Sequence, residues 1–467
     1  MVLFSVPHTT SMVQLSSVMV QLSLPKFLLI TATLLIASYA PVYAQSLTDE
    51  QLSVVTQRLA ESANHSWEYG TRSQVLLEFN APRYSVLSSF PVPPPAKIPS
   101  NLMIVSNRSM SNGNITGPQP LIQDTSAGDP ASIGVAVLLA NWTGQGAIDG
   151  LDYAGAAQDQ LDFLFQNAPK TSDGAISHRM EQVQLWSDFV YMVPPFLAYY
   201  GAVTRNETLL QEAYTQISLY RNYLRDTHAN NLWKHIQLGS GTDNGHWSTG
   251  NAWTAAGMLR VLGTIQQSQY ANSFKSQQEN LANWVQEIHS GIYPLLDSSG
   301  LFHNYADNST TFLDASSTAL LAGTVYRLSL LWGVHKYIPL AELSRKSLSS
   351  PAGANVNISI LATVKPSTTT TSPSPTSSSA SASSSTPDML HITSDGWLTP
   401  VVDPYAYPYQ GQYSPEGQAF VISMQAAWRD WVNDGSKGSS SRRGMSHAMG
   451  AWAVLLTGTL VAWLDMW

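Results

Sequence analysis

Hydrophobic residues recur every three to four positions along most of the chain, which is the spacing that gathers them on one face of a helix. The pattern is clear from Val183 to Tyr200 and from Ala252 to Leu262. Similar stripes occupy residues 48–63, 73–89, 129–140, 152–166, 206–224, 275–289, 314–332, 337–348 and 414–431. Convincing alternation of apolar and polar residues is not found between them, which disfavours βαβ architectures. The sequence therefore predicts about eleven helices in an all-α fold.

The predicted helices come in pairs joined by connections rich in Gly, Asn and Asp, and the longer loops carry polar and aromatic clusters. A toroid of helical hairpins fits this order, with buried inner helices, amphipathic outer helices and a cavity at one end. Pro194 and Pro195 fall inside one stripe. Because each proline removes a backbone hydrogen bond, the helix must kink there or begin afresh.

Residues 366–387 are nearly all Ser, Thr, Pro and Ala, a composition that cannot bury a core and predicts a disordered insert. The insert is either a linker between domains or a long loop within one. Because residues 414–431 form a single predicted helix close to the chain end, we interpret it as a loop inside one domain that spans residues 45–431.

Both ends of the chain carry targeting patterns. Lys26 precedes the apolar run Phe27–Ala40 and the small-residue site before residue 45, which predicts a secretory signal peptide over residues 1–44. The run is short for a membrane anchor. Residues 432–467 combine a small polar spacer with the apolar tail Ala448–Leu464. This favours a glycosylphosphatidylinositol (GPI) signal over a transmembrane span, because almost nothing follows the tail.

Other features of the composition favour some classes of function and exclude others. Seven Asn-X-Ser/Thr sequons predict a glycosylated surface, at Asn64, Asn107, Asn114, Asn141, Asn206, Asn308 and Asn357. A net charge of −8 argues against nucleic-acid binding. The chain has no cysteine, and its histidines lack metal-site spacing, so we expect neither a metal nor another cofactor. The 14 Trp and 20 Tyr residues suit sugar rings, although core packing accounts for most of them.

Asp188 is a single carboxyl group among aromatic and apolar residues that include Trp186 and Phe189. Burying an ionised carboxylate is costly unless it is hydrogen-bonded, and a carboxyl that keeps its proton near neutral pH can act as a general acid. The alternative is that Asp188 caps the helix that begins at Phe189. The residues alone do not separate these two interpretations.

Two further blocks contain candidate ligand-binding residues. His235 either donates to a sugar hydroxyl or has a structural role. The segment His246–Trp253 opens a helix in which Trp247 and Trp253 flank a glycine, so two aromatic faces could hold a sugar ring. Core packing is the alternative for Trp253.

The run from Trp186 to Met192, followed in order by His235, Trp247 and Trp253, resembles glycoside hydrolase family 105, the unsaturated rhamnogalacturonyl hydrolases, which are related to the family 88 unsaturated glucuronyl hydrolases. The resemblance covers roughly residues 50–431. It implies an (α/α)6 barrel of six helical hairpins. It also implies that Asp188 is the acid/base, that Asp129 (or, less closely matched, Asp124) is a second carboxylate, and that His178, His235, Trp247 and Trp253 line the sugar site. We add Trp186 and His246 from the same blocks as substrate-binding candidates.

The activity implied by the resemblance is removal of a terminal uronic acid with a C4–C5 double bond from an oligosaccharide. Together with the targeting patterns of the chain ends, we expect a secreted protein anchored at the cell surface, and we expect a monomer. The acid protonates the double bond and water adds at C5, so no pair of nucleophile and acid is required. At the position where the family has an Arg, this chain has Thr249. Either Arg179 or Lys234 binds the uronate carboxylate instead, or the substrate is not a uronate.

Two other functions remain open. The first is a non-catalytic carbohydrate-binding protein of the cell surface on the same barrel, which the Thr249 departure favours. The second is an anchored mannan-processing helical barrel, but that group depends on adjacent Asp residues, which this chain lacks.

Overall fold

The computed structural model describes residues 46–94, 117–354 and 389–439. The predicted signal peptide, the Ser/Thr/Pro insert, the apolar C-terminal tail and the sequons at Asn107, Asn114 and Asn357 lie outside the described residues. Within the described ranges, every helix is too short or too polar to cross a membrane.

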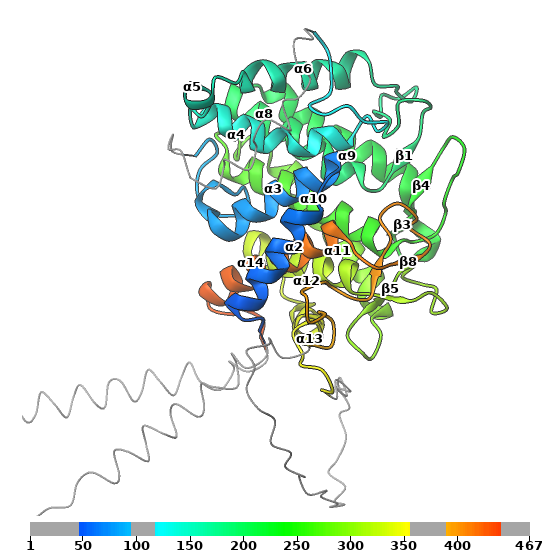
Figure 1. The fold of residues 1–467 in the computed structure, drawn as a ribbon. Helices are drawn as coiled ribbons and strands as arrows, with labels where there is room; N and C mark the ends of the chain where they lie inside the picture. Colours follow the sequence, from blue (N-terminus) through cyan, green and yellow to red (C-terminus); the bar gives the residue numbers. More distant parts are fainter. Residues whose placement is uncertain (1–45, 95–116, 355–388, 440–467) are drawn as a thin grey trace, which may run out of the picture. The chain divides into compact units, whose positions relative to one another are not determined.

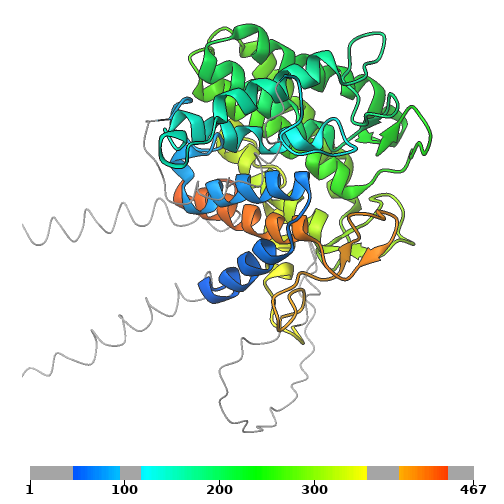
Figure 2. The same cartoon turned by 45° about the horizontal axis from the view of Figure 1, so that its top comes forward.

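Six helices of the described part form a closed ring in which each packs against the next. In ring order they are α3 (Ser66–Asn80), α4 (Gly134–Trp142), α8 (Pro194–Thr204), α10 (Ser248–Gln267), α12 (Ala315–Trp332) and α14 (Pro415–Asn433). Outer helices cover five of them: α2 (Asp49–Ser62) packs on α14, α6 (Tyr153–Gln166) on α4, α9 (Glu207–Leu224) on α8, α11 (Lys275–Ile292) on α10, and α13 (Ile338–Leu348) on α12. Helix α3 is the first helix of the ring and α14 is the last, blue and orange-red in Figures 1 and 2. They lie side by side and so close the ring. The predicted all-α (α/α)6 barrel is confirmed.

Short elements connect these helices. They include α5 (Gly146–Asp149), α7 (Phe189–Met192) and four 3-10 helices, η1 (Pro82–Tyr84), η3 (Asp129–Ile133), η4 (Thr227–Ala229) and η5 (Tyr293–Leu295). Within the described residues, two-residue strands form four antiparallel pairs: β1 (Leu185–Trp186) with β4 (Ile236–Gln237), β2 (Arg225–Asp226) with β3 (Leu232–Trp233), β5 (Phe302–His303) with β6 (Leu313–Asp314), and β7 (Val401–Val402) with β8 (Gln410–Gly411). The last three pairs join consecutive strands as hairpins, whereas β1 and β4 are distant in sequence. Strands β1, β3, β4, β5 and β8 gather on the right of the barrel in Figure 1.

Burial separates the inner helices from the outer ones. In α10 nearly every residue from Ser248 to Ile265 is buried, as expected for a helix surrounded by other helices. In α11, by contrast, buried residues such as Leu281 and Val285 alternate with exposed polar ones. Inner helices therefore form the core, and their side chains can reach solvent only near their ends.

Two helix predictions were wrong in their limits. The stripe at 73–89 corresponds to α3, which begins at Ser66 because the side chain of Glu68 accepts the backbone N–H groups of Asn64 and His65. The stripe at 183–200 is divided into β1, α7 and α8. The two prolines take the first two positions of α8, where a missing N–H costs nothing, so the helix begins afresh there.

The close approach of α10 to α7 predicts a strong effect of one methyl group. A Cβ added at Gly257 would lie 2.1 Å from the carbonyl oxygen of Val190, which is backbone and cannot rotate away. We expect Gly257→Ala to lower the free energy of unfolding by about 1–3 kcal/mol, measured by urea unfolding. Gly323→Ala in α12 is the matched control, because its Cβ would meet nothing closer than 3.5 Å. That variant should be neutral or slightly stabilising, and equal destabilisation by both changes would contradict the packing argument.

Candidate active site

A cavity of about 350 Å³ lies where the inner helices begin. Seven of the eight site residues predicted from the sequence line it: Asp129, His178, Trp186, Asp188, His235, Trp247 and Trp253. Further lining residues come from the first turns of α3 and α14 and from the loop between β7 and β8, namely His65, Trp67, Pro404, Tyr405, Tyr407 and Glu416. The fold thus gathers segments that are up to about 350 residues apart in sequence, from His65 to Glu416.

Asp188 is at the N-cap position of α7, but its side chain makes no capping hydrogen bond. Its backbone is already helical, which turns the carboxyl group away from the N–H groups of the following turn. The side chain lines the cavity instead, and its Oδ2 lies 3.6 Å from Nε2 of His235. Its Oδ1 has no hydrogen-bond partner within the described ranges. Asp188 therefore presents a carboxyl oxygen that a ligand can use.

His235 lies between two carboxylates. Its Nε2 faces Asp188, while its Nδ1 lies 3.0 Å from Oδ2 of Asp243. The hydroxyl of Tyr305 donates to the same Asp243 oxygen at 2.6 Å. Burial lowers the pKa of His235, but the two carboxylates outweigh burial and raise that pKa above its ordinary value. The ring is therefore held in one orientation with a tendency to carry positive charge beside Asp188.

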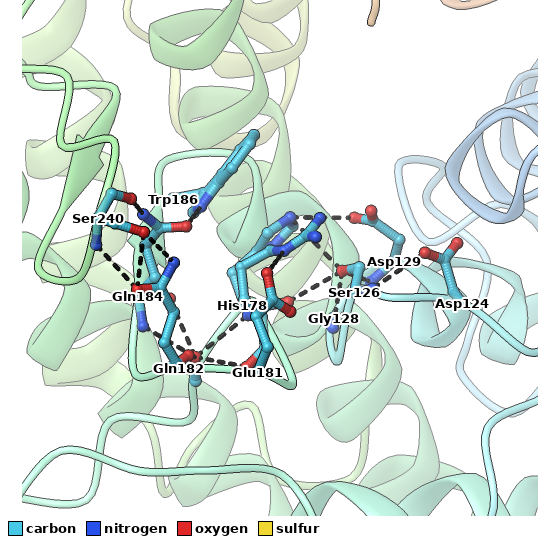
Figure 3. A network of polar contacts seen from close by, with 12 residues as sticks. Asp124, Ser126, Gly128, Asp129, His178, Glu181, Gln182, Gln184, Trp186 and Ser240 are labelled. Carbon is cyan, nitrogen blue, oxygen red and sulfur yellow. Dashed lines mark hydrogen bonds and ion pairs between the residues drawn. The ribbon is translucent and has the colours of Figure 1, made fainter.

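Asp129 is a buried carboxyl group of the site whose pKa is raised. It begins η3, and its backbone N–H donates to the hydroxyl of Ser126 (Figure 3). Its Oδ1 lies 3.6 Å from Nε2 of His178. Burial, reinforced by the neighbouring carboxylates Asp124 and Asp188, raises the pKa of Asp129 well above its ordinary value. Asp129 therefore retains a proton under conditions in which an exposed carboxyl is ionised.

His178 is the neutral counterpart of His235. Burial lowers its pKa to about 4. Its backbone carbonyl accepts the Ser126 hydroxyl at 3.0 Å, and its ring stacks on Trp186 with centroids 5.0 Å apart. A Cβ at Gly128 would stand 3.1 Å from Nδ1 of His178, so the glycine lets the chain pass close to this ring. Burial lowers the pKa of both histidines, but only His235 is flanked by two close carboxylates, so the pKa values of the two rings are shifted in opposite directions.

Aromatic rings cover much of the remaining wall. The edge of Trp186 meets His235 at 5.3 Å. His235 also contacts Trp247 at 4.5 Å and Tyr407 at 4.3 Å. Trp253 packs with Tyr191 and Phe420 and is 3% exposed, so the core-packing interpretation holds for much of this side chain although it also lines the cavity.

His246 is the predicted site residue that the structure does not place on the cavity wall. Its Nδ1 lies 2.7 Å from Asp307 and its Nε2 lies 3.5 Å from Asp226. Both nitrogens therefore face acidic side chains outside the cavity lining, which explains why the sequence neighbour of Trp247 does not share its environment.

The structure shows which of the candidate positions brings a positive charge to the cavity. Thr249 is fully buried and its hydroxyl donates to Asp314 at 3.2 Å, so this position contributes no charge to the cavity. Lys234 lies 3.7 Å from Asp226 and is not on the cavity wall. Arg179 is the only Lys or Arg among the described lining residues. Its Nε donates to Glu181 at 3.0 Å and its guanidinium lies 5.9 Å from the ring centre of Trp186.

Sequence reasoning missed the contributions of Trp67, Tyr405, Tyr407 and Glu416. The stretch from Pro404 to Tyr409 alternates Tyr with Pro and Ala directly before an inner helix, as the polar and aromatic loops around Asp188 and Trp247 do. The place of this aromatic stretch before an inner helix is the sequence signal that could have identified Tyr405 and Tyr407 as site residues. Among the described residues, no group of three or more His, Asp or Glu side chains is arranged to hold a metal ion.

Comparisons with known proteins agree with the resemblance found in the sequence. The model of Glycosyl Hydrolase Family 88 matches residues 124–365, just over half of the 467-residue chain. Unsaturated rhamnogalacturonyl hydrolase YesR of Bacillus subtilis is 23% identical over 182 residues, which cover 37% of this chain and 51% of that protein. The chain thus matches about half the length of this curated relative.

Two crystal structures described as possible members of the GH105 family share the fold. The structure from Klebsiella pneumoniae has a TM-score of 0.58 at 16% identity and covers 84% of this chain and 97% of its own. The structure from Salmonella enterica serovar Paratyphi A has a TM-score of 0.57 at 16% identity and covers 84% and 98%.

The His235–Asp243 pair predicts a shift in proton affinity. Asp243→Asn removes one of two negative neighbours, so the pKa of His235 should fall, as followed by NMR titration of its ring. Because the folded pKa of His235 is raised above its ordinary 6.5, its stabilising contribution is present below that value and is lost as the pH rises through the folded pKa. We therefore expect Asp243→Asn to destabilise the protein by about 1–2 kcal/mol near pH 6 and by less near pH 9.

Asp307→Asn is the control for that titration, because Asp307 makes the corresponding contact with His246 outside the cavity. An unchanged His235 pKa in Asp243→Asn, or an equal shift in Asp307→Asn, would contradict the assignment.

Proposed function

Because the chain belongs to glycosyl hydrolase family 88, we propose that it releases a terminal unsaturated uronic acid from pectic oligosaccharides, by acid-catalysed hydration of the C4–C5 double bond. The printed name of the Bacillus relative, an unsaturated rhamnogalacturonyl hydrolase, supports a pectic substrate. The observation that carries the proposal is that two buried carboxyl groups, Asp188 and Asp129, line the same aromatic cavity.

The chemistry needs one proton donor that can also take a proton back. A carboxylic acid donates its proton to C4, and the positive charge is shared by C5 and the ring oxygen. Water adds at C5 and loses a proton to the carboxylate. The hemiketal opens with formation of a C5 ketone, and the hemiacetal left at C1 then collapses to an aldehyde and frees the second sugar. A single carboxyl can make both transfers, since it ends each cycle protonated as it began.

Asp188 is the residue we assign to this proton transfer. Its Oδ1 has no partner within the described ranges and can hydrogen-bond the substrate, while its Oδ2 lies 3.6 Å from Nε2 of His235, which holds the carboxyl group in place. Asp129, which holds its own proton, adds no negative charge and can hydrogen-bond a sugar oxygen. His178 lies 3.6 Å from Asp129, and because burial lowers the pKa of this histidine, it adds no positive charge that would favour ionisation of Asp129.

Arg179 is the residue we assign to the uronate carboxylate. A guanidinium has five N–H donors in a planar fork, of which Nε serves Glu181 here, and the fork suits a planar carboxylate. The guanidinium lies over the ring of Trp186, 5.9 Å from its centre, and this contact helps to hold it at the cavity wall. Arg179 would thus replace the charge that Thr249 does not supply.

We further propose that the enzyme acts outside the cell, held at its surface by a GPI anchor. The support is the charged and apolar pattern of residues 1–44, the tail Ala448–Leu464 and the sequons, all read from the sequence.

Asp188→Asn should lower the turnover of lyase-digested rhamnogalacturonan by about 10²–10⁴-fold, followed as loss of absorbance of the double bond. Asp307→Asn, which changes a carboxylate outside the cavity lining, should retain wild-type turnover. If wild type and Asp188→Asn behave alike, the proposal fails. Binding of the oligosaccharide without turnover in either protein would support the alternative of a carbohydrate-binding protein, which the buried Thr249 favours.

Arg179→Gln should raise the KM for the unsaturated uronide by about 10–100-fold, since a charge-assisted hydrogen-bonded pair is lost. Lys234→Gln is the matched control, because it removes a cation that does not line the cavity. An unchanged KM in Arg179→Gln would show that the substrate carries no carboxylate at this position.

A further inference from the structure

Glu416 is a buried carboxyl group that the reaction does not use. It occupies the second position of α14, is 3% exposed and lies on the cavity wall. Its Oε2 has no hydrogen-bond partner within the described ranges. A buried polar atom without a partner costs free energy, which a hydrogen bond from a ligand would recover.

The surroundings of Glu416 are acidic. Burial, reinforced by the carboxylates of Glu68, Asp314 and Asp188, raises the pKa of Glu416 to about 8. Glu68 itself is satisfied, because it accepts the backbone N–H groups of Asn64 and His65. Glu416 therefore carries a proton at neutral pH and can both donate and accept a hydrogen bond. This is the pairing that a sugar hydroxyl offers.

An aromatic wall formed by His65, Trp67 and Tyr405 lines the same cavity. Trp67 and Tyr405 meet edge to face at 5.9 Å, and His65 contacts both rings at 4.7 and 4.9 Å. The Tyr405 hydroxyl lies 2.6 Å from Nδ1 of His65 and 3.5 Å from Oε1 of Glu68, which fixes the ring although 59% of the residue is exposed. An exposed ring held in place is suited to contact with the face of a sugar.

Charge decides which kind of sugar fits. The cavity is lined by four acidic side chains, Asp124, Asp129, Asp188 and Glu416, and Arg179 is the only Lys or Arg among the described lining residues. The carboxylate of the uronic acid is assigned to Arg179, so a second anionic group beside the neutral Glu416 would lie near the acidic side chains of Glu68 and Asp188 with no second lining Lys or Arg to balance it. A neutral ring with free hydroxyl groups avoids this cost.

We propose that Glu416 and the wall of His65, Trp67 and Tyr405 form a second sugar subsite, which holds the neutral sugar attached to the unsaturated uronic acid through a hydrogen bond from a ring hydroxyl to the Glu416 carboxyl group. The assignment of this sugar as the leaving group rests on the proposed function. Glu416 is then a specificity-determining residue that selects a neutral over an acidic neighbour in the oligosaccharide.

The test measures binding without turnover. Methyl α-L-rhamnopyranoside, methyl β-D-galactopyranoside and methyl β-D-glucopyranoside are titrated into the full-length protein, and binding is followed by NMR. At least one glycoside should bind to the wild type. Glu416→Leu should weaken that binding about tenfold, because a hydrogen bond is lost, whereas Glu416→Gln, which can still donate and accept, should bind within about threefold of the wild type.

Matched variants separate the subsite from general effects. Glu50 occupies the same second position in α2 but is exposed and away from the cavity, so Glu50→Leu should bind as the wild type does. Tyr405→Ala should weaken binding, whereas Tyr409→Ala, which removes a ring of the same loop that is 70% exposed and does not line the cavity, should not. Thermal unfolding of Glu416→Leu verifies its folding, and Tyr405→Ala provides an independent answer if that variant is unstable.

The outcomes distinguish this inference from the proposed function. Turnover of the unsaturated substrate without binding of any of the three glycosides, or wild-type binding by Glu416→Leu, would overturn the subsite and leave the proposed function standing. Binding of a neutral glycoside that depends on Glu416, in a protein that does not turn over the unsaturated substrate, would overturn the proposed function and the assignment of this sugar as a leaving group.

Discussion

The ring of six inner helices is the constraint on which the rest of the molecule depends. A helix surrounded by others, such as α10, can carry few polar side chains along its length. Its ends differ, because the first N–H groups have no partners within the helix and the helix dipole is positive there. Acidic side chains therefore gather near the beginnings of the inner helices. Glu416 lies in the first turn of α14, Asp129 begins η3 before α4, and Asp188 precedes α7 before α8, and all three line one cavity. The acidic and aromatic site therefore lies at the end of the barrel where the inner helices begin, because the buried middle of these helices can carry few polar side chains.

Within that site, small differences in burial and contact assign different protonation states to similar groups. Both histidines are buried, yet burial is the largest influence on the pKa of His178 and lowers it, while two carboxylates outweigh burial at His235. Asp129 keeps a proton because it is buried beside other carboxylates, and Glu416 does so for the same reason at a different helix end. One cavity thus offers neutral acids, a neutral imidazole and an imidazole that favours its charged form, which is the range of groups that proton transfer to and from a sugar requires.

The departure at Thr249 has a structural explanation. This residue lies inside the barrel and its hydroxyl donates to Asp314, the residue that caps α12, so it serves the packing of two inner helices. The charge expected from the family resemblance is found instead at Arg179, which reaches the cavity from the loop that precedes β1. A cation can therefore reach the cavity from a different segment of the chain, because many loops converge on one end of the barrel.

The spacing of hydrophobic residues determined the helices and their pairing, because burial on one face is a local property of sequence. The family resemblance carried by the ordered motifs predicted Asp188, His178, His235 and Trp247 as site residues, and these four side chains line one cavity. Only the tertiary structure decided that His246 turns to Asp226 and Asp307, that Asp188 does not cap its helix, and that Glu416 and Tyr405 join the wall. These outcomes depend on which distant segments meet at the barrel end, and closure of the ring between its first and last helices fixes that.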